Sequence, residues 1–140
     1  MERPRILLAD DHVAMLEEVR TLLNQDYDVV GAVENGADLV SAAERLKPDL
    51  IISDISMPRM TGFEAAAKVR ASGLDAKLMF LTVQSSPAYL KKARALGASG
   101  YVLKVFIAEQ LRPAVAAVLS GKSYFSPQLP RSGDESPVSA

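Results

Sequence analysis

Residues 7–16 read LLADDHVAML, and this stretch joins two different patterns. The apolar run Leu7–Ala9 stops at two adjacent aspartates, and an apolar stretch with helical spacing begins just after them. A short, continuous apolar run is typical of a strand that is buried on both faces. Like charges repel, and neither Asp10 nor Asp11 has a lysine or arginine beside it, so the pair calls for a partner from elsewhere in the chain.

The same alternation of strand and helix patterns continues along the chain. Strand-like runs are found at Ile6–Ala9, Tyr27–Val33, Leu50–Ser53, Leu78–Thr82 and Gly100–Leu103, and the segments between them carry apolar residues at helical spacing. Five strands alternating with five helices predict an α/β fold, a doubly wound five-stranded parallel sheet with helices on both faces.

Two helix starts are marked and one helix is interrupted by proline. Thr61 and Glu64 have capping-box spacing, and Ser86 precedes Pro87 as a cap residue precedes a proline in the first turn. Pro113 falls in the last helical pattern, where it removes a hydrogen bond, so this helix is expected either to kink or to start late.

Length and composition indicate an ordinary globular protein. The chain has 140 residues and a net charge of -1, which gives no general attraction to nucleic acid or membranes. There is no cysteine, and no apolar run of membrane length, so a cytoplasmic location without a membrane anchor is expected. One folded domain is expected over residues 4–122, followed by a flexible Ser/Pro/Gly-rich tail or linker over 123–140.

Polar residues follow four of the predicted strands. Asp10 and Asp11 follow the first strand, Asp54 the third, Thr82 ends the fourth and Lys104 follows the fifth. Ligands of doubly wound folds bind outside the carboxyl ends of the strands. If the first, third, fourth and fifth strands are neighbours, these side chains gather at one edge of the sheet.

Three carboxylates at one edge favour a bound cation. At about 4 Å and an effective dielectric constant near 20, each pair of like charges costs on the order of 4 kcal/mol. Mg²⁺ prefers oxygen ligands and commonly binds one or two carboxylates together with phosphate oxygens. Lys104 and Thr82 suit phosphoryl oxygens, and Asp54 is a candidate nucleophile that accepts a phosphoryl group.

Four stretches in order carry a resemblance to a known family. ADDH, PDLIISDISMPRMTGFE, LT at the fourth strand and GASGYVLK resemble the receiver domain of two-component response regulators, over Arg5 to Leu119. The resemblance implies a flavodoxin-like receiver fold with strand order 2-1-3-4-5. It also implies a phosphoacceptor rather than an enzyme that turns over a substrate.

The resemblance assigns a magnesium site and a phosphoacceptor. It implies that Asp54 accepts a phosphoryl group from a histidine kinase. Asp11 would bind Mg²⁺ directly and Asp10 mainly through water, with Asp54 and the carbonyl oxygen of Ser56 as further ligands.

It also assigns the switch. Thr82 would hydrogen-bond the phosphoryl group and Lys104 would pair with it, while Tyr101 matches an aromatic position that swings inward when Thr82 moves in. The surface formed by the fourth helix, fifth strand and fifth helix would then change, and dimerisation or contact with a partner would follow.

Within this family, the stretches ADDH, GASGYVLK and LSGKSYFSP most resemble those of the NarL/FixJ-like subfamily. Its members usually carry a LuxR-type DNA-binding domain, which suggests transcription regulation. No such domain is found in this chain, so contact with DNA is expected only through a C-terminal domain outside it. A fragment of a longer regulator and a stand-alone phosphate-relay receiver are both compatible with the sequence.

Two other functional classes share part of this pattern. A Mg²⁺-dependent phosphatase with an aspartyl-phosphate intermediate typically has a second acid two residues after the nucleophile, where this chain has Ser56, and a cap domain is missing. A flavodoxin-like cofactor binder needs a Ser/Thr/Gly-rich phosphate loop after the first strand, where this chain has ADDH.

Several residues depart from the family pattern or lack a role in it. Val83 stands where a small residue is usual, and we expect it to narrow access to Asp54 and slow phosphorylation, dephosphorylation or both. The apolar run Val105–Ile107 is expected either to tuck under the last helix or to form an exposed surface that favours association. His12, the only histidine, is expected to be a residue of the first helical turn.

Overall fold

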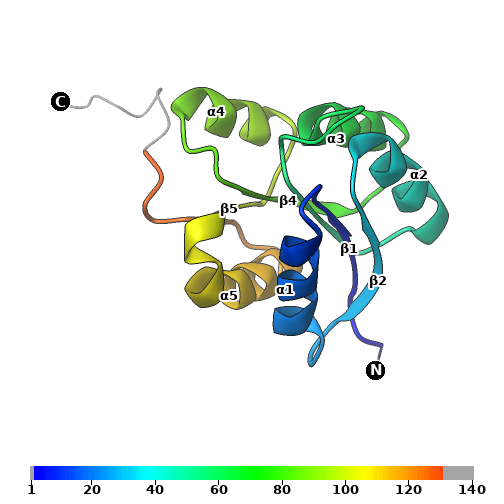
Figure 1. Cartoon of the computed structure of the whole chain (residues 1–140), viewed down its shortest axis with the longest axis horizontal. Coiled ribbons are helices and arrows are strands. Elements are labelled where there is room, and N and C mark those ends of the chain that lie inside the picture. The colour runs from blue at the N-terminus through cyan, green and yellow to red at the C-terminus, as the bar shows by residue number, and fades with distance from the viewer. Residues whose placement is uncertain (1, 131–140) are drawn as a thin grey trace.

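Six parallel strands form one sheet in the computed structural model, which describes residues 2–130 (Figure 1). The strands are β1 (Arg5–Ala9), β2 (Asp28–Val33), β3 (Leu50–Ser53), β4 (Lys77–Thr82), β5 (Gly100–Leu103) and β6 (Tyr124–Phe125). Their order is β2-β1-β3-β4-β5-β6, so the predicted order of the first five strands is confirmed. The short strand β6 adds a sixth strand beside β5, and the predicted fold class is otherwise confirmed.

Five helices cover the two faces of the sheet. They are α1 (Val13–Leu23), α2 (Gly36–Leu46), α3 (Gly62–Ala71), α4 (Pro87–Ala95) and α5 (Ile107–Leu119), and a 3₁₀ turn, η1 (Lys104–Phe106), precedes α5. Helices α1 and α5 lie on one face, and α2, α3 and α4 lie on the other (Figure 1). Within residues 2–130, none of these helices combines the length and the apolar character needed to cross a bilayer.

The continuous apolar runs of the strands arise because both faces are covered. In β1, Leu7 and Ala9 pack into the core under α2, α3 and α4, whereas Ile6 and Leu8 pack into the core under α1 and α5. All four side chains are buried. Successive side chains of a strand point to opposite faces, so a strand between two cores is apolar at every position.

The expected helix starts are confirmed. Thr61 accepts a hydrogen bond from the backbone N–H of Glu64, whose carboxylate accepts one from the N–H of Thr61, which completes the capping box of α3. Ser86 caps α4 ahead of Pro87. Helix α5 begins at Ile107 and continues through Pro113, so the expectation of a late start is wrong.

The segment after α5 is partly built into the fold, which corrects the predicted domain boundary. Tyr124 and Phe125 form β6 and pair with Gly100 and Tyr101 of β5. Ser126 is buried. Residues 124–126 of the segment predicted to be a flexible tail thus contact the fold, and its residues 131–140 lie outside the described part of the chain.

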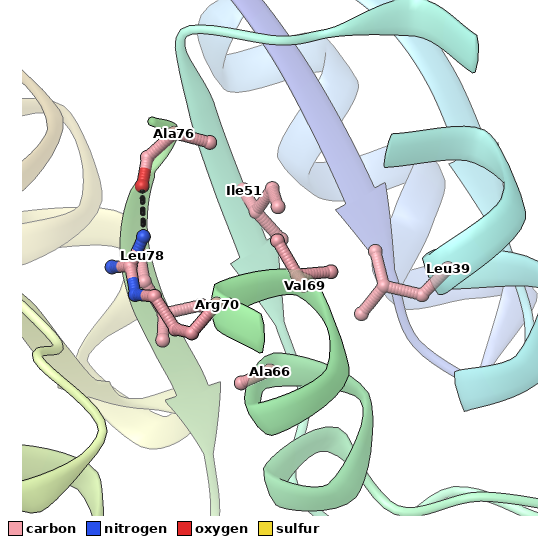
Figure 2. Close-up of a pocket in the computed structure, with 7 residues that line it drawn as sticks. All are labelled: Leu39, Ile51, Ala66, Val69, Arg70, Ala76 and Leu78. Atoms are coloured by element: carbon pink, nitrogen blue, oxygen red, sulfur yellow. Dashed lines mark hydrogen bonds between the residues drawn. The ribbon is translucent and has the colours of Figure 1, made fainter. Parts of the chain in front are cut away.

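Arg70 of α3 ties three elements together beside a small apolar cavity (Figure 2). Its Nη1 donates to the carbonyl oxygen of Ala76 at 2.6 Å, just before β4. Its Nε donates to the carbonyl of Leu96 at 3.3 Å and its Nη2 to that of Gly97 at 3.4 Å, both at the end of α4. Arg70 thus donates to the Leu96 and Gly97 carbonyls, which the end of α4 leaves without helical partners. The other residues lining this cavity are apolar, which suits packing rather than phosphate chemistry.

Candidate functional site

The predicted polar residues do meet at the carboxyl end of the sheet. Asp10 follows β1, Asp54 follows β3, Thr82 is the last residue of β4 and Lys104 follows β5. The backbone N–H of Asp54 donates to the carbonyl of Ala9 at 2.9 Å, which extends the pairing of β1 and β3 by one step. Two acids that are 44 residues apart in the sequence are therefore fixed side by side by the sheet itself.

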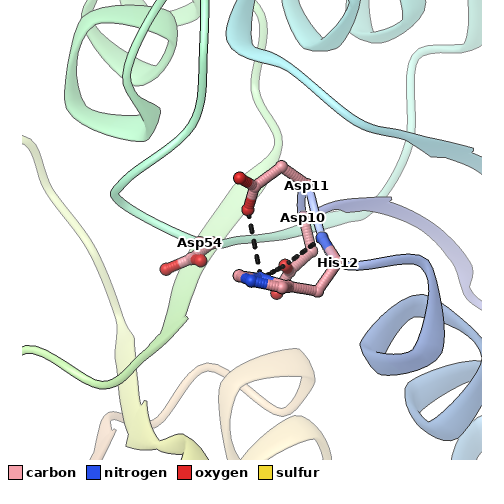
Figure 3. Close-up of side chains that lie close together, drawn as sticks. All are labelled: Asp10, Asp11, His12 and Asp54. Carbon is pink, nitrogen blue, oxygen red and sulfur yellow. Dashed lines mark hydrogen bonds and ion pairs between the residues drawn. The ribbon is translucent and has the colours of Figure 1, made fainter.

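Four side chains form an acidic cluster at this edge (Figure 3). Asp10, Asp11, His12 and Asp54 each offer one possible ligand atom, and these atoms all lie within 4.8 Å of one another. Asp10 and Asp54 are buried, at 3% and 5% exposure, whereas Asp11 and His12 are exposed. The arrangement presents oxygen ligands from inside the fold and leaves one side open to solvent.

Lys104 lies between the two buried acids. Its Nζ is 2.7 Å from Oδ2 of Asp10 and 2.9 Å from Oδ2 of Asp54, and its side chain is only 10% exposed. Burial alone would lower the pKa of Lys104, but its hydrogen bonds to Asp10 and Asp54 and their charges outweigh burial and raise the pKa above its ordinary value. The ammonium group is therefore charged throughout the physiological pH range.

The Asp54 carboxylate is held by both oxygens. Oδ1 accepts a hydrogen bond from the backbone N–H of Ile55 at 2.7 Å, and Oδ2 accepts one from Lys104. Behind it, the first residue of α3 packs on the Asp54 backbone, where a Cβ on Gly62 would lie 2.0 Å from the Asp54 carbonyl oxygen. Glycine is thus needed at position 62 for the helix to approach the loop that carries Asp54.

His12 interacts with the cluster more closely than its sequence position suggested. It is the N-cap residue of α1, just before the first turn. Its backbone N–H donates to Oδ1 of Asp10 at 2.9 Å, and its ring Nδ1 lies 3.3 Å from Asp10 Oδ1 and 3.2 Å from Asp11 Oδ1. The sequence signal for this contact is the placement of a histidine directly after two aspartates at a helix start.

Thr82 and Tyr101 are both fully buried. The Thr82 hydroxyl oxygen accepts a hydrogen bond from the N–H of Gln84 at 3.2 Å, and the Tyr101 hydroxyl donates to the carbonyl of Gln84 at 2.7 Å. Burial, the nearby Tyr89 and the charge of Asp54 raise the pKa of Tyr101. The resemblance implies a tyrosine that swings inward, whereas the ring of Tyr101 is already inside the fold in this structure.

Ser56 lies two residues beyond Asp54 in the loop that leads to α3, and it is exposed. Its carbonyl oxygen as a metal ligand stays a prediction.

Val83 is 72% exposed and lines a hollow with Ser85, Leu103, Lys104 and Val105. Because Lys104 lines the same hollow and pairs with Asp54, the expected effect of Val83 on access to Asp54 stays a prediction.

The apolar run after Lys104 divides between the two expected outcomes. Ile107 is buried in the core under α1 and α5, and Phe106 packs against the other core. Val105 is 79% exposed. The prediction that the run packs under the last helix is thus confirmed for Ile107, whereas Val105 is the residue of the run that adds to the exposed surface.

Comparison with known proteins places this geometry in a family. Residues 6–116 match the family described as the response regulator receiver domain. The transcriptional regulatory protein DesR of Bacillus subtilis is 36% identical over 126 residues, which cover 89% of this chain and 62% of DesR. DegU of Brevibacillus brevis is 33% identical over 127 residues, which cover 89% of this chain and 54% of DegU. The matched region thus covers between 54% and 62% of the length of these two curated relatives.

Solved structures agree with the sequence comparison. The receiver domain of the putative response regulator NarL from Mycobacterium tuberculosis superposes with a TM-score of 0.83 at 29% identity, covering 87% of this chain and 100% of that one. The receiver domain of RcsB from Salmonella enterica, solved with the phosphomimetic BeF3⁻, gives a TM-score of 0.81 at 28% identity, covering 89% of this chain and 94% of that one. The chain belongs to the response regulator receiver domain family.

Proposed function

We propose that this chain is a phosphorylation-controlled switch in which Asp54 accepts a phosphoryl group with the help of Mg²⁺. The observation that carries the proposal is the position of Asp54. One of its carboxylate oxygens is 2.9 Å from Lys104 Nζ, and Asp10 and Asp11 lie within reach of the same cation site. A nucleophilic carboxylate, a fixed positive charge and a set of oxygen ligands are the groups that phosphoryl transfer to an aspartate requires.

The donor set fits magnesium. Three carboxylates face a single lysine, so the cluster keeps an excess of negative charge after Lys104 is paired. Oxygen ligands with an open side suit a cation that retains water and binds phosphate oxygens. We assign Asp10, Asp11, Asp54 and the Ser56 carbonyl as the groups that would hold it.

In the proposed transfer, a carboxylate oxygen of Asp54 attacks the phosphorus atom of the donor. The new oxygen–phosphorus bond forms while the bond to the leaving group, a histidine nitrogen or an acyl oxygen, breaks and its electron pair departs with that group. Bound Mg²⁺ would neutralise the charge on the phosphoryl oxygens and align them with Asp54. Lys104 then donates to a phosphoryl oxygen in place of the Asp54 carboxylate.

Thr82 links the phosphoryl group to the rest of the fold. Its hydroxyl accepts from Gln84 and keeps its own proton to donate to a phosphoryl oxygen. Gln84 in turn accepts from Tyr101. We propose that phosphorylation shifts the population toward the state with Thr82 and Tyr101 held inward, and that the surface formed by α4, β5 and α5 changes with it.

The partners follow from the family and stay proposals. A histidine kinase is the expected donor, and transcription regulation is the expected output because the relatives DesR and DegU are named as transcriptional regulatory proteins. Contact with DNA would come from a further domain. A homodimer formed through α4, β5 and α5 is one way in which the receiver would promote that contact. A cytoplasmic location belongs to the same proposal, because a chain without cysteine suits a reducing compartment.

Mass and oligomeric state, followed together after incubation with a small acyl-phosphate donor and Mg²⁺, test the proposal. We expect one phosphoryl group per chain in the wild type and none in Asp54→Ala. Asp26→Ala, at an exposed aspartate that pairs with Arg112 and is not part of the acidic cluster, is the matched control and should be labelled as the wild type. Unchanged labelling of Asp54→Ala contradicts the proposal, and repeated turnover of a generic phosphate ester would favour a phosphatase instead.

A further inference from the structure

The residues Tyr124–Leu129, which we call the C-terminal strap, close the outer edge of β5. The N–H of Tyr124 donates to the carbonyl of Ser99, and the N–H of Ser126 donates to the carbonyl of Tyr101, both at 2.9 Å. These bonds satisfy backbone groups that an edge strand would otherwise leave open to solvent or to another chain. A partner that approaches the surface formed by α4, β5 and α5 therefore meets the strap at this edge.

Phe125 of the strap lies between the switch tyrosine and α4. Its ring is stacked on that of Tyr101, with centroids 6.3 Å apart and an interplanar angle of 9°. The guanidinium carbon of Arg94, on α4, lies 4.0 Å from the centroid of the Phe125 ring. The inward position of Tyr101 thus provides the flat surface on which Phe125 rests, and the cation of Arg94 adds a favourable contact with the ring of Phe125.

A polar contact fixes the strap to α5. The buried hydroxyl of Ser126 accepts from the N–H of Leu103 at 3.0 Å and donates to the side-chain oxygen of Gln110, which is also buried. The amide nitrogen of Gln110 donates to Gln128 at 2.8 Å. Buried polar groups that are satisfied in this way specify one position for the segment, because any displacement leaves them without partners.

A continuous set of contacts runs from the site to the strap. The Thr82 hydroxyl accepts a hydrogen bond from the N–H of Gln84, and the carbonyl of Gln84 accepts one from the Tyr101 hydroxyl. The ring of Tyr101 in turn stacks on the ring of Phe125. A phosphoryl group on Asp54 that accepts from Thr82 would hold this hydroxyl in the orientation that binds Gln84. Hydrogen bonds in series strengthen one another, so the inward tyrosine and the docked phenylalanine belong to the same state.

We propose that the C-terminal strap reads the state of Asp54, and that phosphorylation tightens its docking on β5 and α5. The point at which the chain leaves the receiver would then be fixed in the phosphorylated form and more variable in position in the unphosphorylated form. This inference rests on the proposed function. Coupling between two sites is reciprocal, so a docked strap must also favour binding of a phosphoryl group at Asp54.

The first test follows the strap directly in the full 140-residue chain. Amide hydrogen exchange at Tyr124 and Ser126 is measured with Mg²⁺ alone and with Mg²⁺ plus the phosphoryl mimic BeF3⁻. Both amides donate hydrogen bonds to β5 or the residue before it, so tighter docking slows their exchange. We expect exchange to slow about fivefold or more, the lower end of the usual range of coupling between sites.

The second test measures the reverse effect. Phe125→Ala is expected to weaken BeF3⁻ binding in the presence of Mg²⁺ by about fivefold or more, although residue 125 does not touch the site. Tyr27→Ala is the matched control, because Tyr27 is a partly buried aromatic residue near the opposite edge of the sheet, and it should bind BeF3⁻ as the wild type does. Ser126→Ala removes the contact with α5 without removing a ring and should weaken binding in the same direction, which covers the case of a Phe125→Ala variant that fails to fold.

The outcomes separate this inference from the proposed function. Normal BeF3⁻ binding by Phe125→Ala and Ser126→Ala, together with unchanged exchange at the strap amides, overturns the coupling and leaves the phosphorylation site intact. A wild type that does not bind BeF3⁻, or binds it equally well as Asp54→Ala, overturns the proposed function and the coupling with it.

Discussion

Among single residues, Lys104 has the most demanding position, because one ammonium group serves two buried carboxylates. It is 2.7 Å from Asp10 and 2.9 Å from Asp54, and no other lysine or arginine within residues 2–130 forms an ion pair with these acids. The lysine therefore has two roles. It holds like charges together in the absence of metal, and it is placed to donate to phosphoryl oxygens once Asp54 is modified.

Replacing Lys104 with methionine should separate these roles. The variant leaves two buried carboxylates without their cation, so we expect its free energy of unfolding in metal-free buffer to fall by about 3 kcal/mol. Mg²⁺ should then stabilise the variant more than the wild type, because the metal becomes the only counter-charge. Urea unfolding with and without Mg²⁺ measures both effects, with Lys91→Met at an exposed lysine of α4 as the control. Equal stabilisation of both proteins by Mg²⁺ would argue against a shared site.

Val83 offers a second prediction for a single side chain. It is exposed and lines a hollow together with Lys104, whose ammonium group contacts Asp10 and Asp54. Truncation to alanine should ease the approach of a small donor and of water, so both labelling and decay should become faster, on the order of threefold. The two rates are measured with a small acyl phosphate and compared with those of Val13→Ala, at another exposed valine. Rates that match the wild type in both directions would dismiss this role for Val83.

Helix α3 shows how one element positions the site. Its capping box fixes where the helix begins, and its first residue, Gly62, packs directly on the backbone of Asp54. The N–H of Gly62 also donates to the carbonyl of Ile55 at 2.7 Å. The loop that carries the phosphoacceptor is thereby attached to the start of a helix, so the stability of that first turn contributes to the geometry of Asp54.

Thr61→Ala tests this attachment. Loss of the capping hydroxyl should cost about 1 kcal/mol of folding stability at neutral pH. Hydrogen bonds from the backbone and side chain of Thr61 lower the pKa of Glu64, so the contribution of its carboxylate is present above its unfolded pKa and lost as the pH falls through the folded pKa. An alanine at position 61 keeps the backbone N–H whose hydrogen bond the Glu64 carboxylate accepts, so only the side-chain share of this effect separates wild type from variant. The difference in stability between them should therefore narrow only slightly in acid. Urea midpoints at neutral pH and at about pH 3 provide the comparison, and a difference that grows in acid would contradict the reciprocal cap.

For the molecule as a whole, the features that the sequence predicted are the layers of the fold and the residues that follow each strand. Strands with continuous apolar runs must lie between two layers of helices, and the residue after each strand must then lie at the carboxyl edge. That reasoning places Asp10, Asp54, Thr82 and Lys104 at one edge of the sheet. The contacts among Asp10, Asp54 and Lys104 confirm that these three side chains meet. The roles of all four residues in phosphoryl transfer stay predictions.

The sequence could not predict what depends on tertiary contacts of short polar segments. β6 has two residues, too few for any periodicity, and its neighbours are Ser, Pro and Gln, which favour a loop by composition. Ser126, the residue after β6, bonds to Leu103, Gln110 and Tyr101, which lie 16 or more residues before it in the chain. The inward position of Tyr101 is hidden from the sequence for the same reason, because its contacts are with the carbonyl of Gln84 and the ring of Phe125.

The boundary of the folded unit gives the last prediction. A chain that ends at Ser123 contains every strand predicted from the sequence, yet it lacks the strap that closes β5. It should lose about 2–3 kcal/mol of folding stability, from the burial of Phe125 and the hydrogen bonds of Ser126 after the entropy of ordering the segment is subtracted. Its bare β5 edge should also make it associate at high concentration. A chain that ends at Pro130 keeps the strap and is the control in urea unfolding and in sedimentation. If both truncated chains unfold at the same urea concentration and stay monomeric, the folded unit ends where the sequence alone placed it, at residue 122, and the strap contributes nothing to stability.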